Sequence, residues 1–169
     1  MDKQYQGEVF LSGYITSLTE QYPELEKLVA TFMSYWHTGH HLHLGKDAPL
    51  HDPASIRQSA VRHIHLIPID INTSNDKRWL RPFARIAPFS RPTSDRWLVY
   101  CVSANRNCCV LAYLKENAHF TARQGFFIGK MIDGAEAFFS DIEQYPLSES
   151  EQVNIFDEKW LIKDLSSDV

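Results

Sequence analysis

The middle of the chain contains the run Arg96-Trp-Leu-Val-Tyr-Cys-Val102, then Ser103-Ala-Asn-Arg-Asn107, then Cys108-Cys-Val-Leu-Ala-Tyr-Leu114. The two outer segments are rich in β-branched and aromatic residues, which favour strands. The mostly polar segment between them has the length of a connection between neighbouring antiparallel strands. The pattern therefore predicts a β-hairpin at the centre of the fold.

Two further strands are expected on the N-terminal side of this hairpin. Residues Glu8–Ile15 are rich in strand-forming residues, and residues Val61–Ile69 alternate between two sets of side chains. Because successive side chains of a strand point to opposite faces, His63 and His65 are expected on the same face of the sheet.

Two amphipathic helices are expected to accompany these strands. In the first, apolar residues recur at steps of three and four between Leu25 and Trp36. Its start is predicted either at a capping box that begins at Ser17 or at Pro23, and Gly39 is a suitable end. The second helix is predicted over residues Thr121 to Ser140.

The order strand, helix, three strands, helix predicts an α+β fold, with an antiparallel β-sheet and helices packed on one face. A chain of 169 residues is long enough for one well-packed domain. We expect residues 1–140 to form the functional domain, followed by an acidic C-terminal extension over residues 141–169. The extension is expected either to belong to the same domain or to be flexible, and it could lie over the basic face.

Composition excludes several classes of protein. No apolar run approaches the length of a membrane span, and the N-terminus lacks the basic start and apolar stretch of a secretory signal. The three cysteines are an odd number and two of them are adjacent, which is a poor disulfide framework. A cytoplasmic protein with reduced thiols and no membrane partner is therefore expected.

Positive charge is concentrated between Lys77 and Lys130, where ten basic residues stand against two acidic ones in a chain of formal net charge −4. In contrast, residues 141–169 hold eight acidic residues and two lysines. Such a basic block attracts phosphate, because each neutralised phosphate releases condensed counterions. Part of this block lies in Asn72–Pro92, a long predicted loop of the kind that often carries function.

His119 lies at the end of the last predicted strand, between Lys115 and Arg123. Cleavage of RNA by its own 2′-hydroxyl requires a base, an acid and cations that stabilise the phosphorane. Imidazole suits the acid or base role, and arginine suits the phosphorane. The other interpretation is a surface histidine beside a helix start, without a role.

The remaining candidates have weaker patterns. Asp95 could orient a catalytic group or only cap a turn. His63 and His65 are compatible with catalysis, RNA contact or packing. A histidine-rich segment invites comparison with a metal site, but its spacing matches no zinc motif and no cysteine lies near it, so solvated histidines are favoured. The segment comprises His37, His40, His41, His43 and His51.

An ordered series of short motifs resembles the YafO family of toxins over about residues 8–139. The matching strings are Gly45-Lys-Asp47, Arg62-His-Ile-His-Leu66, Arg91-x-Thr-Ser-Asp95, Leu98-Val-Tyr-Cys101, Leu111-x-x-Leu-Lys115, His119, Ala122-Arg123, Ile128-Gly-Lys-Met131 and Ala135-x-Ala-Phe138. This resemblance implies the toxin of a type II toxin–antitoxin system. It also implies a RelE-like fold, a twisted antiparallel sheet with helices on one side.

Such toxins are similar in plan to RelE-type ribosome-dependent mRNA interferases, which cut mRNA in the ribosomal A site. The resemblance thus implies three partners (a cognate antitoxin, the ribosome and mRNA) and neither a metal nor an organic cofactor. The oligomeric state is left open.

The site residues are assigned by combining this resemblance with the chemistry above. His119 is expected to be the general acid or base, Arg91 and Arg123 to stabilise the phosphorane, and Asp95 to orient its neighbours. RNA binding is assigned to His63, His65, Arg81, Arg85, Thr93, Ser94 and Lys115.

Two other functions are compatible with the sequence. A binding module could block translation by occupying RNA or the ribosome without cutting. A small metal-dependent hydrolase could use the histidine-rich segment. Cleavage that persists in a chelator separates the nuclease from the metal enzyme, and arrest without new mRNA ends indicates the binding module.

Overall fold

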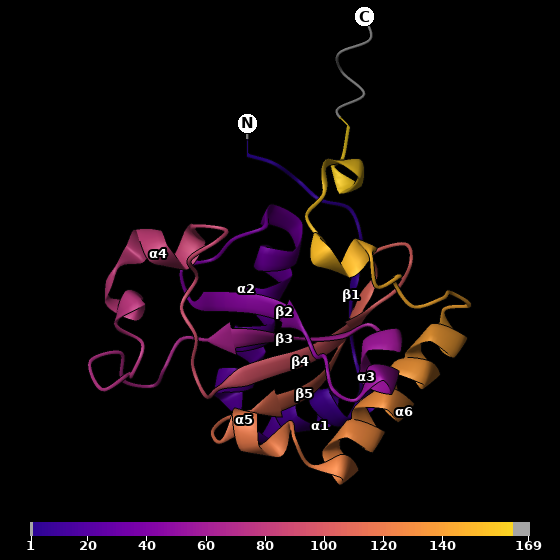
Figure 1. The fold of residues 1–169 in the computed structure, drawn as a ribbon, viewed down its shortest axis with the longest axis horizontal. Coiled ribbons are helices and arrows are strands. Elements are labelled where there is room, and N and C mark those ends of the chain that lie inside the picture. Colours follow the sequence, from indigo (N-terminus) through magenta and orange to yellow (C-terminus); the bar gives the residue numbers. More distant parts are fainter. Residues whose placement is uncertain (1, 164–169) are drawn as a thin grey trace, which may run out of the picture.

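The predicted hairpin is the centre of the sheet. In the computed structural model, which describes residues 2–163, β4 (Trp97–Val102) pairs antiparallel with β5 (Cys108–Leu114). β4 in turn pairs antiparallel with β3 (Val61–Leu66), which pairs with β2 (Leu44–Pro49). β1 (Val9–Leu11) adds to the other edge and runs parallel to β5. The sheet is open, twisted and mixed, with the order β1-β5-β4-β3-β2 (Figure 1).

Helices cover both faces of the sheet. On one face, α2 (Pro23–Thr38) packs through Phe32 against Tyr100 of β4, with ring centroids 4.9 Å apart. On the opposite face, α6 (Gly125–Asp141) packs through Phe138 against Phe10, whose partner in the sheet is Cys109 (Figure 1). The α+β class is confirmed, and the core contains side chains from both faces.

The N-terminal region begins its first helix earlier than predicted. Only Val9–Leu11 is a strand, because the Ser12 hydroxyl accepts a hydrogen bond from the Ile15 N–H and caps α1 (Gly13–Gln21). The predicted strand Glu8–Ile15 was therefore too long, and the capping box at Ser17 was wrong. A side-chain cap of this kind outweighs the weak strand preference of the residues that follow it.

α2 begins at Pro23 and ends at Gly39, as one of the two alternatives predicted. Gly39 has a φ of 85° and its N–H donates to the Tyr35 carbonyl, which is the left-handed helix end that glycine favours. Short helices complete the fold: α3 (Ala54–Gln58), α4 (Pro82–Ile86) and α5 (Ala118–Thr121).

The turn of the central hairpin buries one member of the basic block. Arg106 has a φ of 62° and is 0 % exposed, and its guanidinium lies 4.1 Å from the Trp36 ring centroid. Nη2 donates to the Trp36 carbonyl and Nε to the Ile155 carbonyl. Arg106 therefore joins α2, the hairpin and the C-terminal segment, and it is not available to RNA.

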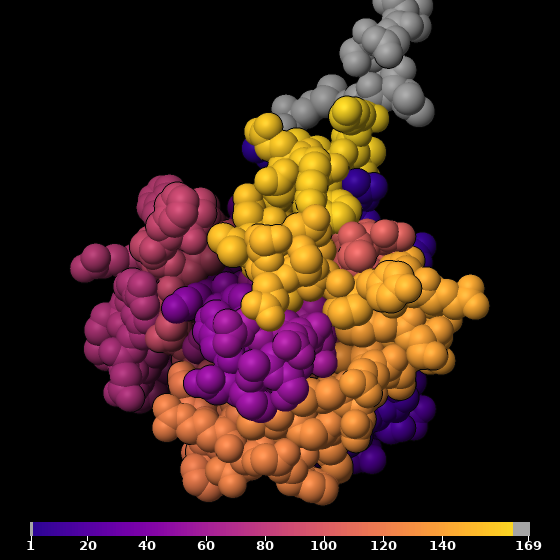
Figure 2. Space-filling view, turned by 45° about the vertical axis from the view of Figure 1, so that its right-hand side comes forward, coloured from indigo at the N-terminus to yellow at the C-terminus, as the bar shows by residue number. Residues whose placement is uncertain are grey.

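The described part of the C-terminal extension packs against the body of the fold. Leu147, Gln152 and Ile155 are buried, and the Gln152 carbonyl accepts a 2.6 Å hydrogen bond from Arg62. Figure 2 shows this segment, in yellow, over the α3 region and beside α6. Residues 164–169, which include two of the acids, lie outside the described residues. Among residues 2–163, no helix has both the length and the apolar character that a membrane crossing requires.

Candidate functional site

The loop that leads into β4 is held in place from three sides. The Lys46 N–H donates to the Pro92 carbonyl at 2.8 Å, and Trp79 Nε1 donates to the Thr93 carbonyl at 2.8 Å. The Thr93 N–H donates to Asp76, whose pKa is held well below its usual range by its hydrogen bonds to Arg78. The loop therefore presents the next residues in a defined position.

Gly45 makes the first of these contacts possible, because a Cβ at this position would lie 2.1 Å from the Pro92 carbonyl oxygen. Gly45→Ala is expected to lower the free energy of unfolding by about 1–3 kcal/mol, the usual cost of overpacking. Gly129→Ala on the exposed face of α6, where a Cβ meets nothing within 4 Å, is the matched control and should stabilise slightly. Urea unfolding of both variants tests this, and equal stabilities would contradict the tight approach.

Asp95 fixes both the backbone and the ring of His119. One carboxylate oxygen, Oδ1, accepts the His119 N–H at 2.8 Å and lies 2.7 Å from His119 Nδ1. Burial alone would raise the pKa of Asp95, but the hydrogen bonds from His119 lower it. Both side chains are about half exposed. With Nδ1 turned to the carboxylate, Nε2 is the nitrogen left to exchange a proton with a ligand.

Behind His119 lies a cluster of aromatic rings on one face of the sheet. The Trp97 ring centroid is 4.7 Å from that of His119 and 4.1 Å from that of His63. The His65 ring lies 5.9 Å from His119. The structure thus brings together four residues that the sequence supplied from three separate segments. Trp97 was not among the predicted site residues, because an aromatic residue in a strand is more often part of the core.

Burial lowers the pKa of His63 to about 3 and that of His65 to about 4. His65 Nδ1 lies 2.8 Å from the Ser94 nitrogen and 3.0 Å from Trp97 Nε1, and it also lies 2.7 Å from the Ser94 carbonyl oxygen, a contact that opposes the effect of burial on the pKa. Near neutral pH both rings are uncharged. His63 is partly exposed, whereas His65 is 3 % exposed, so the RNA contact predicted for His65 has almost no side-chain surface to use.

This burial predicts acid sensitivity. Between pH 6.5, the ordinary pKa of histidine, and pH 4, the unfolded chain binds a proton at His65 that the folded chain does not. The free energy of unfolding should therefore fall as the pH falls, by on the order of 3 kcal/mol for this group. His65→Asn keeps an acceptor near Ser94 but cannot titrate. It should therefore flatten the plot of unfolding free energy, measured by urea unfolding, against pH. A parallel curve would show that His65 is not the cause.

The predicted cations are not all gathered at His119. Arg91 donates from Nη2 to the Gly39 carbonyl at 2.7 Å and lies 5.7 Å from the Tyr35 ring centroid, away from the histidine face. Arg123 is exposed one helical turn after His119. No hydrogen bond or ion pair within residues 2–163 joins Arg91 to His119 or Asp95.

The other predicted RNA-binding residues differ in whether their side chains already make contacts within the protein. Arg85 donates to the carbonyls of Trp79 and Leu42 and so supports the loop. Lys115 lies 3.9 Å from Glu24 in an exposed pair, and Arg81 is exposed. Thr93 and Ser94 belong to the loop itself.

Lys46 is a candidate that sequence reasoning did not assign. It is exposed on β2, the edge strand, and its charge contributes to the lowered pKa of His65, after burial and after the charge of His119. The string Gly45-Lys-Asp47 was part of the family pattern, but a segment with glycine and proline gave no sign of a strand.

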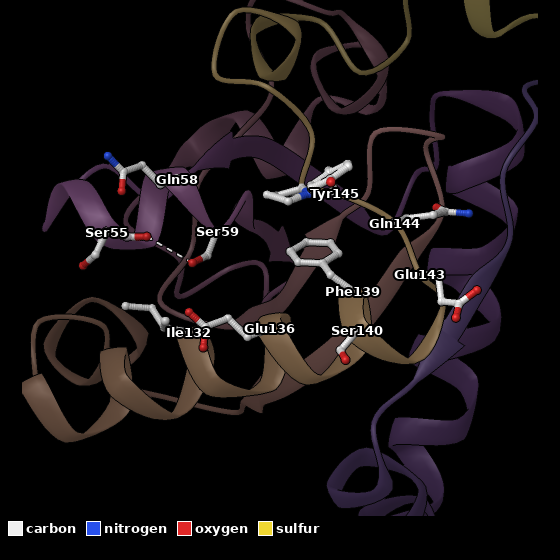
Figure 3. A pocket seen from close by; sticks show the side chains of 11 residues that line it. Ser55, Gln58, Ser59, Ile132, Glu136, Phe139, Ser140, Glu143, Gln144 and Tyr145 are labelled. Carbon is white, nitrogen blue, oxygen red and sulfur yellow. Dashed lines mark hydrogen bonds between the residues drawn. The ribbon is translucent and has the colours of Figure 1, made fainter.

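A depression between α3 and α6 holds none of the predicted residues. Its volume is about 630 Å³, and Figure 3 shows Glu136 and Glu143 at its rim with Phe139 between the two helices. Acidic residues at this rim make it unsuited to RNA.

The histidine-rich segment does not assemble into a metal centre. His41 and His43 are ring neighbours at 5.2 Å, while His37 Nδ1 lies 3.2 Å from the Tyr5 carbonyl. Across the part of the chain that the structure describes, no group of three or more histidine, cysteine or acidic residues could hold a metal ion.

Comparison with known protein families identifies the class of this molecule as a toxin of type II toxin–antitoxin systems. The model of the family described as toxin YafO matches residues 25–140, which is more than half of the chain. The chain belongs to this family, and a cognate antitoxin is the partner that membership implies. Comparison with curated proteins and with solved structures gave no match.

Proposed function

We propose that this toxin is a ribosome-dependent mRNA endoribonuclease, which cleaves through the RNA 2′-hydroxyl and acts in the cytoplasm. The observation that carries the proposal is the pair Asp95–His119, in which one carboxylate oxygen holds both the backbone and Nδ1 of a half-exposed histidine. A histidine fixed in this way beside uncharged rings is suited to proton transfer at a phosphodiester.

In the proposed reaction, the 2′-oxygen attacks the adjacent phosphorus and its proton passes to a base. The phosphorane then collapses, the bond to the 5′-oxygen breaks, and that oxygen takes a proton from an acid. The products are a 2′,3′-cyclic phosphate and a 5′-hydroxyl end. His119 Nε2 acts as the acid or the base, and Asp95 is a positioning residue.

Arg123, exposed one turn from His119, is assigned to the charge of the phosphorane. Arg91 was expected beside it, but Arg91 donates to the Gly39 carbonyl and lies over the Tyr35 ring. We therefore assign Arg91 to the binding of RNA further along the strand. His63, which is partly exposed, contacts the RNA as an uncharged group, whereas the buried His65 supports the Trp97 ring from within the fold.

The test is to induce the chain in bacteria and to map 5′ ends on one message in two forms, with an intact start codon and with the start codon removed. New ends on the translated form alone support the proposal. In a purified translation system, cleavage is expected to persist with a zinc-selective chelator at unchanged Mg²⁺ concentration. Growth arrest without new ends would instead favour a protein that blocks the ribosome without cutting.

A further inference from the structure

A basic cleft is lined by residues of β2, of the arm that carries α4 and of the C-terminal segment. Figure 1 shows where these three parts of the chain lie. Its volume is about 1000 Å³. Of the described residues that line it, five are basic and two are acidic. The basic ones are Lys3, Lys46, Arg62, Arg78 and Arg91.

The cleft keeps a net positive charge after its acids are counted. Asp47 pairs with Arg62 at 3.1 Å and accepts a hydrogen bond from the Tyr35 hydroxyl at 2.6 Å, so its negative charge is balanced by Arg62. The other acid, Asp2, is exposed near the N-terminus. Arg78 is paired with Asp76, but Lys46 has no ion pair within residues 2–163. Arg91 Nε is buried and has no hydrogen-bond partner among the described residues.

An aromatic side chain stands beside these cations. Phe89 lines the cleft and is 102 % exposed, although a phenylalanine in water loses the benefit of burial. Positive charge together with an exposed aromatic ring is the combination that binds single-stranded nucleic acid, because phosphates meet the cations and a base stacks on the ring.

The cleft and the Asp95–His119 pair share one loop. Thr93 lines the cleft, and Asp95, two residues later, holds His119. Two residues of extended chain span at most about 7 Å, so the two places are close along the loop. Lys46 connects them as well, since it lines the cleft while its charge acts on His65.

We infer that this cleft binds the RNA strand next to the scissile phosphate, with Lys46 and Arg91 on the backbone phosphates and Phe89 under a base. The inference rests on the proposed function, because the RNA strand that is cut at His119 would continue past the β2 edge of the sheet into the cleft. The C-terminal segment Val153–Phe156, which carries no lysine or arginine, forms the far wall.

The experiment measures binding of a fluorescent 2′-O-methyl RNA oligonucleotide, which lacks the attacking hydroxyl, to the purified chain at a series of salt concentrations. Lys46→Ala should lower the slope of log affinity against log salt by about 0.7, the value of one phosphate contact on a single strand. Phe89→Ala should weaken binding at least about fivefold with an unchanged slope, since it removes stacking and no charge. Lys27→Ala, an exposed lysine of α2 outside the cleft, should match the wild type.

The outcomes separate this inference from the proposed function. If the wild type cuts translated mRNA but Lys46→Ala and Phe89→Ala bind as the wild type does, or if the wild type binds no oligonucleotide, the inference is overturned and the nuclease stands. If Lys46→Ala changes the slope and Phe89→Ala changes nothing, the cleft is a site for any anion and not for an RNA strand. If both variants behave as expected but no message is cut, the cleft binds RNA in a protein that does not cleave.

Discussion

His119→Ala should reduce mRNA cleavage by roughly 10²–10⁴-fold, the usual contribution of a general acid or base. Nε2 is the proton-transferring atom of the proposed site, and alanine leaves no group in its place. The measurement is the rate of appearance of new 5′ ends in a purified translation system, with stability checked by urea unfolding. Because the ring is half exposed, the fold should be nearly unchanged.

His51→Ala provides the matched control, since His51 is an exposed histidine outside the site and should leave the cleavage rate unchanged. Asp95→Ala should give a smaller loss than His119→Ala, confined to kcat, because it frees the ring without removing it. Imidazole nitrogen chemical shifts should then show a mixture of tautomers, a change that a purely structural role would not produce. If His119→Ala cuts at the wild-type rate, His119 has no catalytic role.

Asp47→Ala should destabilise the protein by about 3–5 kcal/mol, the largest stability effect that we expect. It leaves the guanidinium of Arg62, which is 4 % exposed, without its carboxylate partner. The hydroxyls of Tyr35 and Tyr100 lose the same acceptor. Burial is the largest cause of the raised pKa of both tyrosines and persists in the variant, so neither can supply the missing negative charge near neutral pH.

Urea unfolding checks this value, with Asp133→Ala as the control because Asp133 is an exposed acid on α6 that should change stability little. The double variant Asp47→Leu, Arg62→Met removes both charges and should cost less than Asp47→Ala alone. A double variant at least as unstable as the single one would mean that the buried charge of Arg62 is not the source of the loss.

Local sequence patterns predicted the strands and the helix whose apolar residues form a regular buried face. The β4–β5 hairpin, β3 and the helix from Pro23 to Gly39 appear where the patterns indicated. In these segments the spacing of apolar residues matches the strand or helix repeat, so the local sequence alone indicates the secondary structure.

β2 shows where such reasoning ends. Its segment contains Gly45 and Pro49, which discourage a strand, yet it pairs with β3 at the sheet edge. Edge pairing uses backbone groups that every residue has, and proline is tolerated at the edge of a sheet. Only the neighbouring strand and the loop at Pro92 select this conformation for Gly45.

By itself the sequence determined the α+β class and the family, because each follows from patterns of residue type along the chain. Only the tertiary structure decided what the charges do. Arg106, counted in the basic block, is buried against Trp36, whereas Lys46 meets Arg91 and Phe89 in one cleft. The physical reason is that a cation acts through what surrounds it, and those surroundings come from segments far apart in the chain.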